Sequence, residues 1–164
     1  IEVRSQRALM GIMDKTGPLH NPADRDHCAQ YVIAVGLIFG RLDARDFEDA
    51  VAGDPRIDAL REKTTITEDP AYSEGFYDPQ RRTSANAIQV FFRDGTQTPK
   101  VEVEYPAGHP RRGAEFMPAL TNKVRSSLAR RYVARRAAEI QALYDAPERL
   151  DATAVDSFVD MLCP

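Results

Sequence analysis

The chain has 164 residues, 43% hydrophobic and 29% charged, which is the composition of an ordinary globular domain with a core of its own. A formal net charge of −3 argues against nucleic acid or an acidic membrane surface as the partner of the whole chain. There is no signal peptide and no apolar run long enough to span a bilayer, and two distant cysteines exclude a disulfide framework, so we expect a cytoplasmic protein.

The first residues predict a strand and then a short helix. Residues 1–4 alternate apolar and charged side chains, as a half-buried strand does. Ser5 can cap a helix that ends where residues 15–18 (KTGP) break it. Because the chain starts at Ile1 on a strand and without methionine, we expect it to be a fragment of a longer protein.

Residues 21–40 predict a long central helix. Asn21 is a suitable cap, and Pro22 occupies the first helical position, where a missing N–H group costs nothing. Residues 28–39 are apolar almost all round, which is typical of a helix buried between layers.

One stripe of this central helix carries varied acid–base chemistry. At about 100° per residue, Asp24, His27 and Tyr31 point the same way, so that a carboxylate, an imidazole and a phenol lie together. We therefore expect the candidate site at the start of this helix.

The middle of the chain alternates helix caps with strand signals. Asp43 predicts a helix over residues 44–51, and Asp54 followed by proline predicts another. Residues 64–68 have β-branched character and little hydrophobicity, which indicates an edge strand. Residues 69–83 are dense in proline, tyrosine and charge, and predict an ordered excursion or a mobile loop.

Residues 87–93 and 100–105 alternate cleanly around Asp94-Gly95 and predict a β-hairpin. A turn-rich basic loop follows at residues 106–113. Helices are then predicted over residues 114–128, 132–144 and 152–162. Helices around a small, mostly antiparallel sheet place the chain in the α+β class. The basic stretch in the last long helices lacks interleaved aromatic residues, so we interpret it as a solvated face.

Four ordered motifs resemble the C-terminal part of the MmgE/PrpD family: DKTGPLHNPADRDHCAQY, DPRIDALREK, EDPAYSEGFYDPQRR followed by SANA, and VEYPAGHPRR. The resemblance runs from Ile1 to about Arg131. It implies a larger protein with an all-helical domain and a smaller α+β domain. Residues 1–144 would be the smaller domain, and residues 145–164 a helical tail that packs on the missing helical domain.

The resemblance also implies a reaction: elimination of water from the tricarboxylate 2-methylcitrate to give 2-methyl-cis-aconitate in the methylcitrate cycle of propionate breakdown. It implies no iron–sulfur cluster or other cofactor. Much of the family's catalytic equipment, including the main base, would lie upstream of Ile1. We therefore expect this chain alone to be inactive, and the whole enzyme to be a homodimer without nucleic-acid or membrane partners.

The resemblance assigns Tyr31 to the active-site cleft, and we predict Tyr31 and His27 as catalytic residues. Lys15, Arg25 and Arg82 are predicted to bind substrate carboxylates, and no metal ligand is predicted. For Tyr31, the structural alternative is a core tyrosine with a bonded hydroxyl group.

Two alternatives remain open at this stage. One is a related polycarboxylate reaction of the same family, such as cis-aconitate decarboxylation or an epimerisation. The other is a non-catalytic domain for dimerisation or partner docking, on which an exposed apolar patch would be expected.

Overall fold

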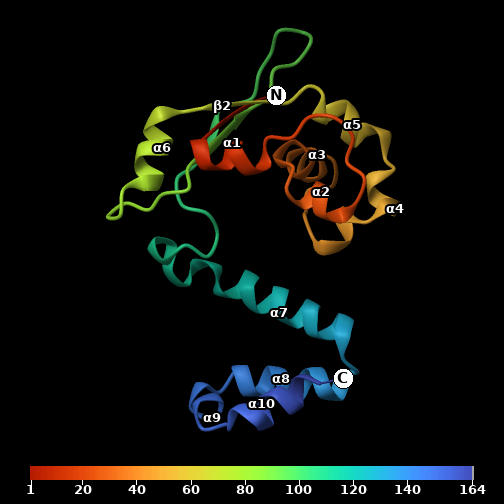
Figure 1. Cartoon of the computed structure of the whole chain (residues 1–164), viewed down its shortest axis with the longest axis vertical. Coiled ribbons are helices and arrows are strands. Elements are labelled where there is room, and N and C mark those ends of the chain that lie inside the picture. Colours follow the sequence, from red (N-terminus) through yellow and green to blue (C-terminus); the bar gives the residue numbers. More distant parts are fainter. Residues whose placement is uncertain (164) are drawn as a thin grey trace. The chain divides into compact units, whose positions relative to one another are not determined.

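A four-stranded mixed sheet organises residues 1–106 of the chain (Figure 1). The computed structural model describes residues 1–163. The strands are β1 (Glu2–Ser5), β2 (Thr65–Glu68), β3 (Asn86–Gln89) and β4 (Val101–Val103). Their order is β2-β1-β3-β4; β1 is parallel to β2, and the other two pairings are antiparallel. The predicted α+β class is confirmed, and β2 is the predicted edge strand.

One face of the sheet is apolar and covered by helices. Val3 is paired with Ile66 on one side and with Ile88 on the other, so these three side chains share a face. That face packs against α1 (Arg7–Met13) and α3 (Ala29–Phe39). The alternation that predicts the first strand thus reflects burial on one side only.

The predicted hairpin is confirmed, with shorter strands. Ile88 is paired with Val101, and the connection turns at Gly95, whose φ of +85° suits glycine. Beyond Gln89 the regular ladder gives way to an isolated bridge and to a bond from the Val90 N–H to the Thr98 hydroxyl oxygen at 3.0 Å. Side-chain bonding therefore replaces part of the predicted β-ladder.

The prediction of one central helix over residues 21–40 is wrong, because this segment forms two helices. Asn21 caps α2 (Pro22–Asp26), its side-chain oxygen accepting from the Asp24 N–H at 2.9 Å, and α3 begins only at Ala29. Cys28 between them is extended and fully buried, and its Sγ lies 3.6 Å from the Lys15 carbonyl oxygen. The break is a tertiary effect, since no proline or glycine stands there.

Residues 43–61 form short turns around the buried start of α3. Asp43 caps the 3₁₀ turn η1 (Ala44–Phe47), and hydrogen bonds from Arg45 hold the pKa of the Asp43 carboxyl at about 2. The short α4 (Asp49–Ala52) follows, and then α5 (Pro55–Arg61), which is capped by Asp54 as predicted.

The segment predicted as an excursion or loop contains a helix, α6 (Pro70–Tyr77). Asp69 caps it through a bond from the Ala71 N–H at 3.0 Å, and Pro70 occupies its first position. This is the same cap-and-proline signal as at α5, hidden by the density of proline and glycine around it.

The core that positions the candidate site lies between α3 and α5. Cys28, Tyr31, Val35 and Ile57 are completely or almost completely buried there, and Phe47 packs against them. The side chains that face inward from the starts of α3 and α5 are therefore fixed by close packing.

Residues 107–163 belong to a second compact unit, distinct from the first at residues 1–106. It contains η2 (Pro110–Phe116), α7 (Met117–Arg131), α8 (Ala134–Tyr144), α9 (Pro147–Asp151) and α10 (Val155–Leu162). The Tyr132 hydroxyl donates to the Leu162 carbonyl oxygen at 2.6 Å, so the end of α7 is tied to the end of α10. The boundary predicted at residues 144 and 145 stays a prediction. No described helix combines the length and apolar character needed to cross a membrane.

Candidate functional site

Two adjoining cavities beside the loop after α1 form the candidate site, which we call the loop cleft. The larger, of about 490 Å³, is lined by residues 15–18, by Gln30, and by Asp58, Arg61, Glu62 and Thr64 at the end of α5. The smaller, of about 330 Å³, shares Pro18, Asp58 and Arg61 with it. Its other lining residues are Leu19, Arg25, Tyr31, Asp49, Ala52 and Gly53.

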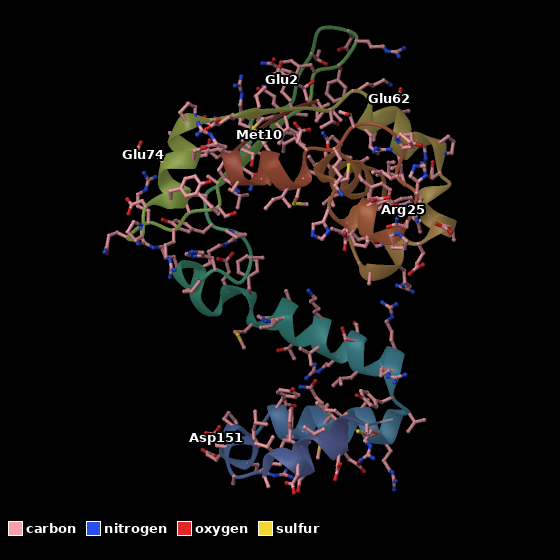
Figure 2. The ribbon with its side chains drawn as sticks, in the orientation of Figure 1. Glu2, Met10, Arg25, Glu62, Glu74 and Asp151 are labelled. Atoms are coloured by element: carbon pink, nitrogen blue, oxygen red, sulfur yellow. The ribbon has the colours of Figure 1, made fainter. Side chains whose placement is uncertain are left out.

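Elements from distant parts of the sequence border the loop cleft. Figure 2 labels Arg25 on α2 and Glu62 just beyond the end of α5. Ile57 of α5 is completely buried in one cluster with residues of α3, so α5 packs closely against α3 beside the cleft.

Lys15 borders the larger cavity as a half-buried side chain. Within residues 1–163, no carboxylate forms an ion pair with its ammonium group. Lys15 is thus a cation at the cavity wall that can bind an anionic ligand without first breaking a salt bridge.

Arg25 borders the smaller cavity and is almost completely buried. Its Nη1 donates to the Phe47 carbonyl oxygen at 2.7 Å, and its Nη2 lies 2.7 Å from Oδ1 of Asp49. Asp49 is 88% exposed, so Arg25 is paired with a carboxylate that water also solvates. A ligand could compete for this charge, but Arg25 already stabilises the fold.

Tyr31 borders the same cavity from the core side and is 2% exposed. Its hydroxyl group donates to the Asp46 carbonyl oxygen at 2.6 Å, and its ring stacks on Phe47 with centroids 6.1 Å apart. Burial raises the pKa of the Tyr31 phenol above its ordinary value. The phenol is therefore protonated near neutral pH. Its O–H donates to the Asp46 carbonyl oxygen, and its own oxygen can still accept a hydrogen bond.

His27 and Arg82 lie outside the lining of the loop cleft. His27 ends α2 with its side chain 57% exposed and its Nδ1 against the Asp26 carboxylate. Arg82 follows α6 with a φ of +49°, and its N–H donates to the Asp78 carbonyl oxygen at 2.8 Å. The structure thus brings together Lys15, Arg25 and Tyr31, while the predicted stripe is lost because the helix breaks before Tyr31.

Sequence reasoning missed Arg61, which borders both cavities. Its side chain is 11% exposed; Nη1 contacts the Asp58 carboxylate and Nη2 donates to the Gly17 carbonyl oxygen at 2.8 Å. A usable signal exists, because Arg61 stands four positions after the buried Ile57 and so shares its helix face.

The loop cleft is polar and nearly balanced in charge. Lys15, Arg25 and Arg61 are its cations, and its carboxylates are Asp49, Asp58 and Glu62. Such a lining can donate N–H bonds to an anionic ligand and orient it. Among residues 1–163, no three His, Cys, Asp or Glu side chains lie so that they could hold a metal ion.

Comparisons with known proteins agree on one family. The MmgE/PrpD C-terminal domain matches residues 1–146. The 2-methylcitrate dehydratase of Cupriavidus necator is 50% identical over 98% of this chain and 33% of its own length. The 2-methylcitrate dehydratase of Escherichia coli K12 is 47% identical over 98% of this chain and 33% of its own length. The mitochondrial 2-methylcitrate dehydratase of Yarrowia lipolytica is 50% identical over 80% of this chain and 25% of its own length. The chain thus spans about a third of the bacterial relatives.

Proposed function

Because this chain belongs to the MmgE/PrpD family, as its C-terminal domain, we propose that it is the C-terminal part of a 2-methylcitrate dehydratase. The reaction would be elimination of water from 2-methylcitrate to give 2-methyl-cis-aconitate, as a step of propionate breakdown. The observation that carries the proposal is identity of 47–50% to proteins of that name over 98% of the chain. We further propose a cytoplasmic homodimer that needs no metal or other cofactor.

The role that we propose for this domain is to form one wall of the substrate site at the loop cleft. A tricarboxylate needs cations and N–H donors, which Lys15 and Arg25 supply from that wall. The elimination also needs a base for the proton next to a carboxylate and an acid for the departing hydroxide. We propose that the main base comes from the preceding part of the protein, so that this chain alone is inactive.

Tyr31, His27 and Arg82 keep their predicted roles within this proposal, but only Tyr31 lines the loop cleft. Tyr31 borders the smaller cavity, and its oxygen can accept a hydrogen bond from a substrate hydroxyl or carboxyl group. For His27 and Arg82, a role requires that the rest of the enzyme extends the site beyond the loop cleft.

Turnover by the full-length protein tests the proposed reaction. The unsaturated product absorbs in the ultraviolet, so we expect absorbance to rise when 2-methylcitrate is added. If the protein leaves 2-methylcitrate unchanged but decarboxylates cis-aconitate, the related family reaction replaces the proposed one. Absence of turnover with every polycarboxylate would favour a docking domain.

Tyr31→Phe separates the structural role of the phenol from the catalytic one. We expect the free energy of unfolding to fall by about 1–3 kcal/mol, because the buried Asp46 carbonyl oxygen loses its donor. If Tyr31 is also catalytic, kcat falls by about 10²-fold or more in full-length protein that remains folded. Tyr77→Phe, at a side chain 64% exposed, is the matched control and should change neither quantity. An unchanged kcat in Tyr31→Phe would leave Tyr31 with the structural role alone.

A further inference from the structure

We propose that Arg61 is a positioning residue, which holds the Lys15 loop (residues 14–18) so that the Lys15 ammonium group meets a substrate carboxylate. The substrate part of this inference rests on the function proposed above. The key contact joins residues far apart in the sequence: Nη2 of Arg61 donates to the Gly17 carbonyl oxygen at 2.8 Å.

The guanidinium group of Arg61 is oriented before it meets the loop. Asp58, one turn earlier on α5, contacts Nη1 and leaves Nη2 directed at Gly17. The helix beneath is fixed, because Ile57 is completely buried. A planar guanidinium group can make both contacts at once, which the point charge of a lysine cannot do in the same geometry.

A second anchor holds the other end of the Lys15 loop. Nε2 of Gln30, a buried residue of α3, donates to Oδ1 of Asp14 at 2.5 Å. The thiol of Cys28 approaches the Lys15 carbonyl oxygen at 3.6 Å. The loop turns at Gly17, whose φ of +84° is one that glycine adopts without strain. The backbone is therefore tied down on both sides of Thr16, with Lys15 between the anchors.

The charges indicate that Arg61 acts through the loop. The positive charge of Arg61 is compensated by the adjoining carboxylate of Asp58, whereas Lys15 has no ion pair within residues 1–163. Loss of the bond between Arg61 and Gly17 should therefore leave the reacting groups in place and make the position of the Lys15 ammonium group less fixed. Such a change raises KM and preserves kcat.

Trypsin provides a readout of the loop that does not depend on activity, because it cleaves after Lys15 when the backbone there is free to move. In native full-length protein we expect Arg61→Met to speed cleavage of the Lys15–Thr16 bond about tenfold, the effect of losing one charged hydrogen bond. KM for 2-methylcitrate should rise about tenfold, with kcat within about twofold. Arg56→Met is the matched control, since Arg56 lies on the same helix, forms its ion pair with Asp54 and lines neither cavity.

Two further variants keep the test decisive. Asp58→Asn, at a side chain 64% exposed, should leave the fold intact and speed cleavage after Lys15, as Arg61→Met does. Arg61→Lys keeps the charge without the forked geometry and should behave like Arg61→Met. An unchanged cleavage rate after Lys15 in Arg61→Met overturns the inference, and so does faster cleavage without a change in KM. If the wild-type protein ignores 2-methylcitrate, the proposed function fails, while the cleavage rates still decide whether Arg61 holds the loop.

Discussion

Replacing Asp46 by alanine is expected to lower the free energy of unfolding by about 2–4 kcal/mol. The Asp46 side chain is completely buried, and its Oδ2 accepts from Nη1 of Arg41 at 2.6 Å and from the Asp43 N–H at 2.7 Å. Removing the carboxylate leaves the Asp43 N–H without this partner and opens a small void beneath η1. The loss stays below that of a fully buried ion pair, because Arg41 is 50% exposed and water can solvate its charge.

Urea unfolding measures this effect as a lower midpoint at an unchanged slope. Glu48→Ala is the matched control: Glu48 is exposed, makes no side-chain cap bond, and should change the free energy of unfolding by no more than about 0.5 kcal/mol. Because the Asp46 carbonyl oxygen also accepts a hydrogen bond from the Tyr31 hydroxyl group, the variant should disturb the wall of the smaller cavity. Equal midpoints for the Asp46 and Glu48 variants would show that the buried carboxylate does not stabilise the fold.

Lys15→Met in the full-length protein is expected to lower kcat/KM for 2-methylcitrate by about 10- to 100-fold, mainly through KM. The expected loss corresponds to one hydrogen bond between charged groups, worth about 1.5–3 kcal/mol. Lys15 is the cation of the loop cleft that has no ion pair within residues 1–163, so a carboxylate can bind it without displacing a protein group.

Steady-state kinetics with Lys63→Met as the control isolates this effect. Lys63 is exposed, follows α5 closely, and does not line either cavity. Both variants remove one positive charge from the same neighbourhood, so a general electrostatic effect would lower kcat/KM in both. If Lys15→Met and Lys63→Met behave alike, Lys15 does not contact the substrate.

The parts of the fold that local chemistry determines could be predicted from the sequence. The caps at Asn21 and Asp54 are short-range signals, in which a side-chain oxygen meets an N–H group two or three residues on. The hairpin follows from period-two alternation around Asp94-Gly95. Each of these features depends on neighbours in the sequence, so no tertiary information is needed.

The break between α2 and α3 could not be predicted in that way. It depends on burying Cys28 next to the Lys15 carbonyl oxygen, a contact between residues that periodicity cannot connect. The helical pattern continues across residues 27 and 28 in the sequence, and the predicted stripe of Asp24, His27 and Tyr31 follows from that continuity. Tertiary packing overrides it.

The candidate site shows the same division. Tyr31 could be selected from the family resemblance, and Lys15 and Arg25 as cations able to bind a carboxylate; the structure places all three at the loop cleft. Sequence reasoning missed Arg61, whose bond to Gly17 joins residues far apart in the sequence. The local signal is its position four residues after the buried Ile57, which places Arg61 on the inward-facing side of α5.

Chemical labelling of Lys15 tests most directly whether this domain forms a wall of the substrate site. Full-length protein would be treated with an amine-acylating reagent, with and without saturating 2-methylcitrate, and each lysine would be quantified by mass spectrometry. The account predicts that substrate protects Lys15 about tenfold, matching one charged contact, while Lys63 and Lys100 are labelled at unchanged rates. Equal labelling of Lys15 in both conditions, in protein that turns over 2-methylcitrate, would contradict the account.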